Sequence, residues 1–150
     1  MATATLSIIV ERPIEEVFAY VIDIKNLNEW VPVILDSWPV SGNLPKVGST
    51  YNVKAQFMGK TMEIPSEVVG YEPNHLYAYK SYGSLTYVDT ITFRETEAGT
   101  LITEHIHMES DGWFSRLLDP LKLIISKRSH QKNQTLLKAL LEDGKVAVLA

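Results

Sequence analysis

The first part of the chain combines one strand pattern with two short helical patterns. Residues 3–11 are rich in β-branched side chains and lead to Pro13, which suits the first position of a helix because its missing N–H needs no partner there. Apolar residues then recur at helical spacing at Ile14, Val17, Phe18 and Val21. Asp23 is a suitable cap for a second short helix, which Pro32 ends. The inner face of this helix comprises Leu27, Trp30 and Val31.

From residue 33 onward, apolar and polar residues alternate with the period of two that is typical of half-buried strands. Short turns interrupt this pattern, among them Met58-Gly59-Lys60 and Glu72-Pro73-Asn74, and such turns favour hairpin connections. Six strands are predicted in this part of the chain. The clearest of their segments are 51–57, 62–68, 76–82, 87–93 and 102–108.

The last pattern predicts a long helix that begins near Asp119-Pro120 and continues to Asp143-Gly144. Its apolar stripe, together with the residues just before it, comprises Phe114, Leu117, Leu118, Leu121, Ile124 and Ile125. The same face continues through Arg128 and Lys132. We expect this stripe to face the sheet, because no other predicted helix is long enough to cover it.

The order of the elements is therefore β-α-α-β6-α. Consecutive hairpins imply an antiparallel sheet, and its apolar face must be covered by the long helix. The predicted fold class is α+β, with a curved seven-stranded antiparallel sheet wrapped around the C-terminal helix and an internal cavity between them. No repeat or linker divides the chain, so residues 1–150 are predicted to form a single domain.

Composition narrows the classes of function. The net charge of −4 argues against a nucleic-acid partner, and the Lys and Arg residues of segment 122–138 are spread around the helix axis. The chain has no cysteine, which excludes disulfides and thiolate chemistry and fits a reducing compartment. It shows no signal-peptide pattern and no apolar run long enough to span a membrane. We expect a cytoplasmic protein that is a monomer or a weak homodimer.

Several short segments resemble those of a known superfamily. They are Arg12-Pro13-x-Glu15-x-Val17-Phe18, Asp23, Trp30-x-Pro32, Tyr71-Glu72-Pro73 before Leu76-x-Ala78-Tyr79, and Ala98-Gly99-Thr100. Their order and spacing resemble the START/polyketide-cyclase superfamily, also called SRPBCC or helix-grip proteins, over essentially the whole chain. One departure is Ala98, where the family's hairpin has a second glycine.

This resemblance implies a sheet that grips the C-terminal helix around a cavity for hydrophobic or amphipathic molecules. Members of the superfamily bind lipids, plant hormones or polyketides, some shape or dehydrate nascent polyketides, and others act as co-chaperones. The motifs themselves are helix caps, turns and core aromatic residues. They therefore indicate the fold and leave the function open.

Cofactor and metal motifs are absent from the sequence. It contains no phosphate-binding glycine loop, nucleophile elbow, zinc-protease motif or dinucleotide fingerprint, so no cofactor is predicted. His105 and His107 share a strand face and could bind a metal together with a third ligand. The apolar residues between and beside them, Ile106 and Met108, occupy the inner face, so we expect two exposed histidines and no metal site.

Some polar residues are directed inward by the patterns around them. They are Ser66, Asp89, Glu104, Arg128 and Lys132. A carboxylate in an apolar cavity has a raised pKa and can act as a proton donor or base, which makes Glu104 and Asp89 the candidates for catalysis. Arg128 is near the centre of the helix stripe, so we expect it to point into the cavity and to hold an acidic ligand. The alternative is that these groups form structural pairs or reach solvent.

The predicted lining combines the inner faces of the strands and of the helices. The ligand-binding candidates are Trp30, Tyr51, Val53, Phe57, Met62, Ile64, Ser66, Tyr87, Ile91, Ile106, Leu121, Ile125 and Arg128.

Three functions follow from these observations. The first is binding of a hydrophobic or amphipathic small molecule, such as a lipid or polyketide, for transport or sensing. The second is a cyclase or dehydratase that uses cavity polar residues, which requires two or more of them to converge on one apolar chamber. The third is a co-chaperone-like interaction module, which requires an exposed apolar patch.

Overall fold

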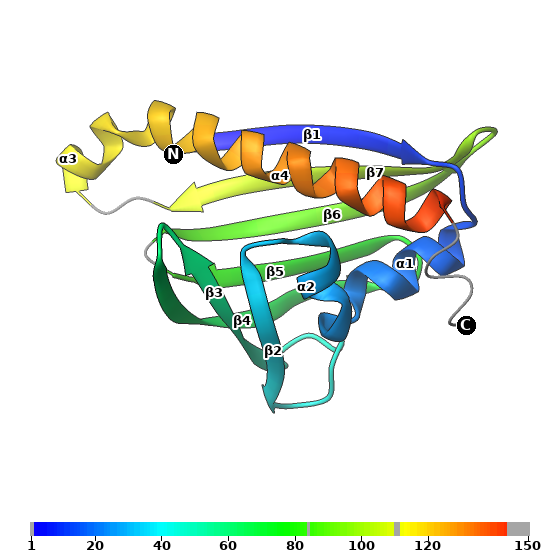
Figure 1. Ribbon diagram of the computed structural model, residues 1–150, viewed down its shortest axis with the longest axis horizontal. Coiled ribbons are helices and arrows are strands. Elements are labelled where there is room, and N and C mark those ends of the chain that lie inside the picture. The colour runs from blue at the N-terminus through cyan, green and yellow to red at the C-terminus, as the bar shows by residue number, and fades with distance from the viewer. Residues whose placement is uncertain (1, 84, 110–111, 144–150) are drawn as a thin grey trace.

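The computed structural model describes residues 2–83, 85–109 and 112–143 (Figure 1). The strands are β1 (Ala2–Val10), β2 (Ile34–Ser41), β3 (Thr50–Phe57), β4 (Lys60–Glu72), β5 (Leu76–Tyr82), β6 (Thr86–Thr96) and β7 (Gly99–Glu109). The helices are α1 (Ile14–Ile22), the 3-10 helix η1 (Ile24–Asn26), α2 (Leu27–Trp30), α3 (Gly112–Leu117) and α4 (Asp119–Glu142). Asp23 was predicted to cap the helix that contains Leu27 and Trp30, but it caps η1, which precedes that helix, since its carboxylate accepts a hydrogen bond from the Lys25 N–H at 3.0 Å.

The seven strands form one antiparallel sheet in the order β1-β7-β6-β5-β4-β3-β2. Consecutive strands from β2 to β7 are neighbours, and the last strand, β7, also pairs with the first strand, β1. The long helix α4 runs along β1 and β7 in Figure 1, and α2 packs against both α4 and β2. The predicted fold class, α+β with a long C-terminal helix on a seven-stranded antiparallel sheet, is confirmed.

The hairpin between β6 and β7 is held against the end of β1. Gly99 has a φ of +138°, and a Cβ atom there would overlap the Val10 carbonyl oxygen, so only glycine fits. The fully buried Thr100 donates a hydrogen bond from its hydroxyl to the Arg12 carbonyl at 2.8 Å. These contacts determine where the chain leaves β1 and enters α1.

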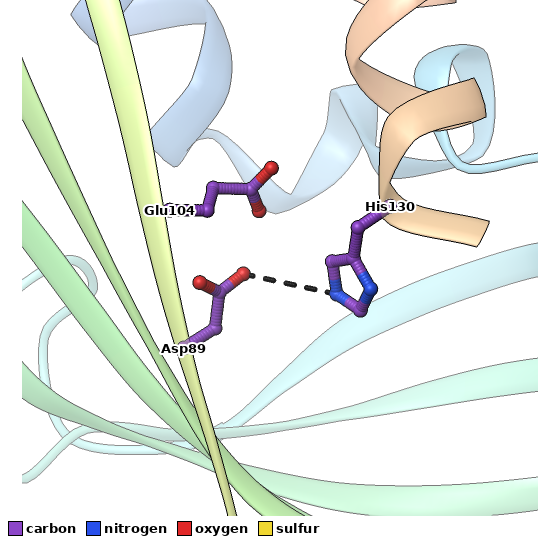
Figure 2. A group of neighbouring side chains, drawn as sticks. All are labelled: Asp89, Glu104 and His130. Carbon is purple, nitrogen blue, oxygen red and sulfur yellow. Dashed lines mark ion pairs between the residues drawn. The ribbon is translucent and has the colours of Figure 1, made fainter. Parts of the chain in front are cut away.

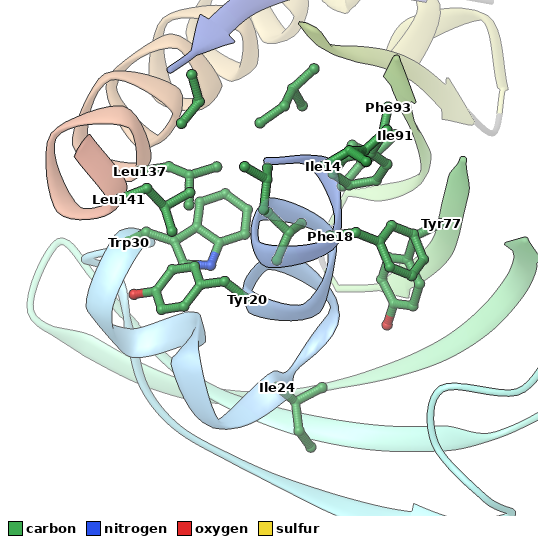
Figure 3. Packing of buried hydrophobic residues seen from close by; sticks show 14 of the residues in the cluster. Ile14, Phe18, Tyr20, Ile24, Trp30, Tyr77, Ile91, Phe93, Leu137 and Leu141 are labelled. Carbon is green, nitrogen blue, oxygen red and sulfur yellow. The ribbon is translucent and has the colours of Figure 1, made fainter. Parts of the chain in front are cut away.

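Two apolar clusters make up the core. The larger one joins α1, α2, the sheet and the second half of α4, and Figure 3 shows Leu137 and Leu141 of α4 beside Trp30 of α2. The smaller one covers β1 and β7, with Leu123 of α4 packed against it, and comprises Ala4, Leu6, Ile106 and Met108.

The orientation of α4 differs from the sequence-based expectation. Its buried residues are Asp119, Asn133, Gln134, Leu137 and Leu141. The stripe expected to face the sheet is exposed to between 44% and 65% at Phe114, Leu117, Leu118, Leu121, Ile124 and Ile125. At 100° per residue, Leu121 lies about 160° from Leu137 around the helix, so the two leucines cannot both contact the sheet. The prediction of the inner face was therefore wrong for this helix.

This orientation predicts opposite outcomes for two leucine substitutions in the same helix. Leu137→Ala should lower the free energy of unfolding by about 2–5 kcal/mol, because it leaves a cavity in the core. Leu121→Ala should change it by less than about 0.5 kcal/mol, because that side chain is already exposed. Urea denaturation of the two variants measures both values. A larger loss for Leu121→Ala than for Leu137→Ala would contradict the described orientation.

Candidate functional site

An internal cavity of about 150 Å³ lies between the sheet, α2 and α4. Its walls are mostly apolar or aromatic, and the residues of this kind are Val21, Ile22, Ile24, Leu27, Trp30, Val31, Val33, Ile34, Tyr51, Val53, Ala55, Ile64, Tyr77, Tyr79, Tyr87 and Ile91. The remaining residues of the lining are polar, and they are Ser66, Ser81, Glu104, Ser129, His130 and Asn133. Among the described residues, no Lys or Arg contributes to the lining.

The cavity reaches the surface beside α4. Two of its lining residues are exposed, Ser129 on α4 and Val33 just before β2. Most of the other lining residues are buried or half-buried. We therefore place the mouth of the cavity between the middle of α4 and the start of β2.

Two carboxylates and a histidine meet at one end of the cavity. Figure 2 shows Asp89 from β6 and Glu104 from β7 close together, with His130 of α4 facing them. The Asp89 Oδ2 atom lies 3.9 Å from His130 Nε2 and accepts a hydrogen bond from the Tyr79 hydroxyl at 3.3 Å. Asp89 is fully buried behind the lining, whereas Glu104 and His130 reach the cavity.

Burial decides the charge state of Asp89. Removal from water raises the pKa of this carboxyl group well above its usual value, and the charge of Glu104 together with a hydrogen bond to it raises the pKa further. The Tyr79 hydroxyl acts in the opposite direction with a smaller effect. Asp89 therefore holds a proton at pH values where an exposed aspartate is ionised. Its Oδ1 atom has no hydrogen-bond partner among the described residues.

Glu104 and His130 are oriented by hydrogen bonds from α4. The buried Gln134 donates from Nε2 to Glu104 Oε2 at 2.7 Å, which ties β7 to the helix. His130 Nδ1 lies 2.8 Å from the Ser126 carbonyl oxygen, which can only accept, so Nδ1 carries a hydrogen. His130 Nε2 is therefore the ring atom directed at Asp89.

Four tyrosines complete this wall of the cavity. The rings of Tyr79 and Tyr87 pack edge to face at 6.1 Å, and Tyr87 packs in the same way on His130 at 5.9 Å. Burial raises the pKa of Tyr77 and of Tyr87 to about 12, and raises those of Tyr51 and Tyr79 well above the usual value. All four hydroxyl groups are therefore neutral at physiological pH and can donate hydrogen bonds.

Seven of the predicted ligand-binding residues line this cavity. They are Trp30, Tyr51, Val53, Ile64, Ser66, Tyr87 and Ile91. The two carboxylates expected to point inward, Asp89 and Glu104, are buried together as described above. Alternation along the strands placed these side chains inward, except that of Trp30, which lies on α2 and was placed by the helical pattern.

The other predicted lining residues lie elsewhere. Phe57 is exposed at the end of β3, and Met62 stands near the same hairpin, beyond the cavity. Ile106 is buried on the inner face of β7, but it packs in the smaller core cluster. Leu121 and Ile125 are exposed on the outer face of α4.

The expectation that Arg128 points into the cavity was also wrong. Arg128 and Lys132 lie on the outer face of α4, where they border a shallow groove with Thr135. They follow Leu121 and Ile125 on the same side of the helix. The error therefore has the same cause as for those two residues, since the side of α4 predicted to face the sheet is the outer side. No Lys or Arg side chain is therefore available among the described lining residues to hold an acidic ligand.

Some cavity residues were not anticipated. On α4, the inward-facing polar residues are His130, Asn133 and Gln134. They share a helix face with the apolar Leu137, and this helical spacing is the sequence signal that could have identified them as inward-facing. On β5, Tyr77, Tyr79 and Ser81 share one face. The charge of Lys80 between them indicates that this face is the inner one.

The cluster also has potential metal ligands. Asp89, Glu104 and His130 each offer one atom, and these atoms lie within 4.8 Å of one another. Atoms that bind one zinc ion at about 2.1 Å are roughly 3.4 Å apart, so the three side chains would have to move closer together around an ion. Their described contacts are those of a hydrogen-bonded acid cluster. His105 lies on the outer face of the sheet, where its Nδ1 is 3.0 Å from the Thr5 hydroxyl, and His107 shares that face.

Comparison with protein families now identifies the class to which this fold and cavity belong. Residues 1–142 match the model of the family described as "Polyketide cyclase / dehydrase and lipid transport". The chain belongs to this family, as the resemblance of its motifs indicated. No curated protein matches it significantly. Among the described residues, no helix has the length and apolar character needed to cross a membrane.

Solved structures share the fold at low sequence identity. The di-domain ARO/CYC StfQ from the steffimycin biosynthetic pathway matches with a TM-score of 0.76 and 15% identity, over 94% of this chain and 51% of that one. This chain thus spans about half of that protein. A protein from Thermus thermophilus matches with a TM-score of 0.74 and 16% identity, over 91% and 94% of the two chains. Ara h 8.0201 matches with a TM-score of 0.72 and 18% identity, over 93% and 97%. These similarities establish the fold.

The raised pKa of Asp89 predicts a pH-dependent stability difference. The Asp89 carboxyl group binds its proton more tightly in the folded protein than in the unfolded chain. The free energy of unfolding therefore falls as pH rises from the pKa of the unfolded chain, about 4, toward the higher pKa of the folded protein. Asp89→Asn removes this titration. The variant should therefore gain stability relative to the wild type as pH rises above about 4, as measured by urea denaturation.

The exposed Asp36 provides the matched control. Asp36→Asn removes an exposed carboxylate in the same way and supplies the stability difference against which that of Asp89→Asn is compared at each pH. A difference between Asp89→Asn and the wild type that does not change with pH would contradict the assignment of a protonated, buried Asp89.

Proposed function

We propose that the protein binds a small, mainly apolar molecule with one neutral polar group inside the cavity. The observation that supports this proposal is the chamber itself, whose apolar and aromatic walls converge on a polar end formed by Glu104, His130 and the tyrosines. Binding sites for small molecules commonly combine such walls with a few polar groups that fix orientation. The membership of a family described by polyketide cyclases and lipid transport also supports a hydrophobic ligand.

The volume limits the size of the ligand. An apolar cavity of about 150 Å³ in another protein binds benzene, so this cavity of similar volume fits a single ring or a short chain. Drug-sized ligands occupy about 300 Å³ or more. A long acyl chain or a full polyketide therefore does not fit inside the described chamber. It could place one end there and leave the rest at the mouth beside Ser129.

The charges favour a neutral polar group. The polar end of the cavity contains Glu104 and, behind it, Asp89, while no Lys or Arg is among the described lining residues. A second anion buried there would face a carboxylate without a compensating charge, which is costly. A hydroxyl or carbonyl group can instead exchange hydrogen bonds with His130 and the neutral tyrosine hydroxyls.

Trp30 offers a further reason to expect a polar atom on the ligand. This residue lines the cavity, and its buried indole N–H has no hydrogen-bond partner among the described residues. Leaving a buried donor unsatisfied costs about 1–3 kcal/mol. A ligand acceptor that reaches this N–H would remove that cost.

A second candidate function is acid–base catalysis in the same chamber. It is favoured by the convergence of Asp89, Glu104 and His130, because a protonated carboxyl group close to a carboxylate and an imidazole provides both an acid and a base. A dehydratase would use one group to remove a proton next to a carbonyl and another to protonate the departing hydroxyl. Conversion of a short β-hydroxyketone, lost in Glu104→Gln while binding persists, would favour this candidate over simple binding.

The binding proposal predicts that neutral single-ring ligands bind more tightly than anionic ones. Para-ethylphenol should bind at least about tenfold more tightly than para-ethylbenzoate at neutral pH, because only the benzoate carries a charge into the acidic end of the cavity. Trp30 fluorescence reports binding once Trp38→Phe and Trp113→Phe have removed the other two tryptophans.

Glu104→Gln provides the control for this comparison. It removes the charge at the polar end while keeping the size of the side chain, so the difference between the phenol and the benzoate should shrink. Equal or tighter binding of the benzoate to the wild type would contradict the proposed preference for a neutral polar group on the ligand. Failure of both compounds and of similar single-ring molecules to bind would contradict the cavity proposal.

A further inference from the structure

An exposed apolar surface occupies α3 and the first turns of α4. None of the residues of α3 is buried, and Trp113 is 75% exposed. We call this surface the apolar patch, and it comprises Trp113, Phe114, Leu117, Leu121, Ile124 and Ile125. Single exposed apolar residues are common on protein surfaces, but a continuous group of large ones indicates a binding surface.

The charge around the apolar patch is opposite to that of the whole chain. Residues 112–132 contain five Lys or Arg residues and a single acidic residue, Asp119, although the chain as a whole has a net charge of −4. Arg128 and Lys132 lie on the same outer face of α4 as Leu121 and Ile125. The surface is therefore apolar at its beginning and basic further along the helix.

This order matches the structure of a lipid bilayer surface. Arg128 follows Leu121 by seven residues, which corresponds to about 10 Å along the helix axis. If the N-terminal end of α4 enters the interface with the helix axis tilted steeply to the membrane plane, this separation places Leu121 about 5–10 Å deep, the depth to which interfacial helices bury apolar residues, and leaves Arg128 at the level of the phosphates. Tryptophan, here Trp113, is also favoured at this level because it combines an apolar ring with an N–H donor.

We propose that the apolar patch docks the protein on a membrane surface that contains anionic lipids. The charge argues against self-association through the same surface. In a two-fold dimer the patch would contact its own copy, which would bring Arg128 and Lys132 of both chains into one interface, where like charges repel. An anionic bilayer instead offers apolar tails to Leu121 and phosphates to these cations, and each Lys or Arg near such a surface adds attraction.

Docking in this way also brings the cavity mouth close to the lipid. Ser129, at the mouth, follows Ile125 of the apolar patch by one helical turn. A molecule could then pass between the bilayer and the cavity, and only this step rests on the proposed function. The docking itself depends only on α3 and the outer face of α4.

Vesicle flotation tests the proposal with the chain of residues 1–150. The wild type should bind vesicles of phosphatidylcholine with about a quarter phosphatidylglycerol, and should bind pure phosphatidylcholine more weakly. The double variant Leu121→Gln/Ile125→Gln should lower the affinity for the anionic vesicles about tenfold or more. Arg128→Glu/Lys132→Glu should lower it to a similar extent and weaken its dependence on salt.

Two exposed valines outside the apolar patch provide the matched control. Val40→Gln/Val47→Gln removes apolar residues that are 57% and 61% exposed, and it should leave vesicle binding unchanged. Para-ethylphenol binding should persist in every patch variant, which separates a failure of docking from a failure of the cavity. Absence of wild-type binding to anionic vesicles would overturn the proposal. A dimer that Leu121→Gln/Ile125→Gln dissociates, without any vesicle binding, would also overturn it and would make the patch a contact between copies.

Discussion

The contact between Glu104 of β7 and Gln134 of α4 determines how the rest of the molecule is arranged. A carboxylate that is 2% exposed needs hydrogen-bond donors, and the Gln134 amide supplies one at 2.7 Å. This contact, together with the burial of Leu137 and Leu141, turns the polar side of α4 toward the sheet. His130 then faces Asp89, and the apolar residues of the first turns of α4 are left on the outside.

This arrangement gives the two sides of one helix different properties. The inner side contributes His130 and Asn133 to a small chamber whose polar end is acidic and partly protonated, which suits a neutral group on an otherwise apolar molecule. The outer side presents large apolar residues followed by Arg128 and Lys132, which suits a negatively charged bilayer. The mouth of the chamber, at Ser129, lies at the boundary between the two sides.

The sequence predicted the fold well because its signals are local. Pro13, Asp23 and the hairpin turns mark where elements begin and end, and strand alternation placed Asp89 and Glu104 inward. The helix side of the site could not be predicted in this way. An apolar stripe normally faces the core, and on α4 it faces outward, since the buried carboxylates require polar partners from the helix. The volume of the cavity depends on how side chains pack across elements, which no local pattern encodes.

The orientation of α4 can be measured directly because the chain contains no cysteine. Single cysteines introduced as Ile125→Cys and Asn133→Cys, on the outer and inner sides of the helix, can each be labelled with a maleimide. We expect the cysteine at position 125 to react at close to the rate of an unfolded peptide. The cysteine at position 133 should react at least about a hundredfold more slowly, because it is reached only through local opening. Equal rates, or faster labelling at position 133, would contradict the described orientation and the site built on it.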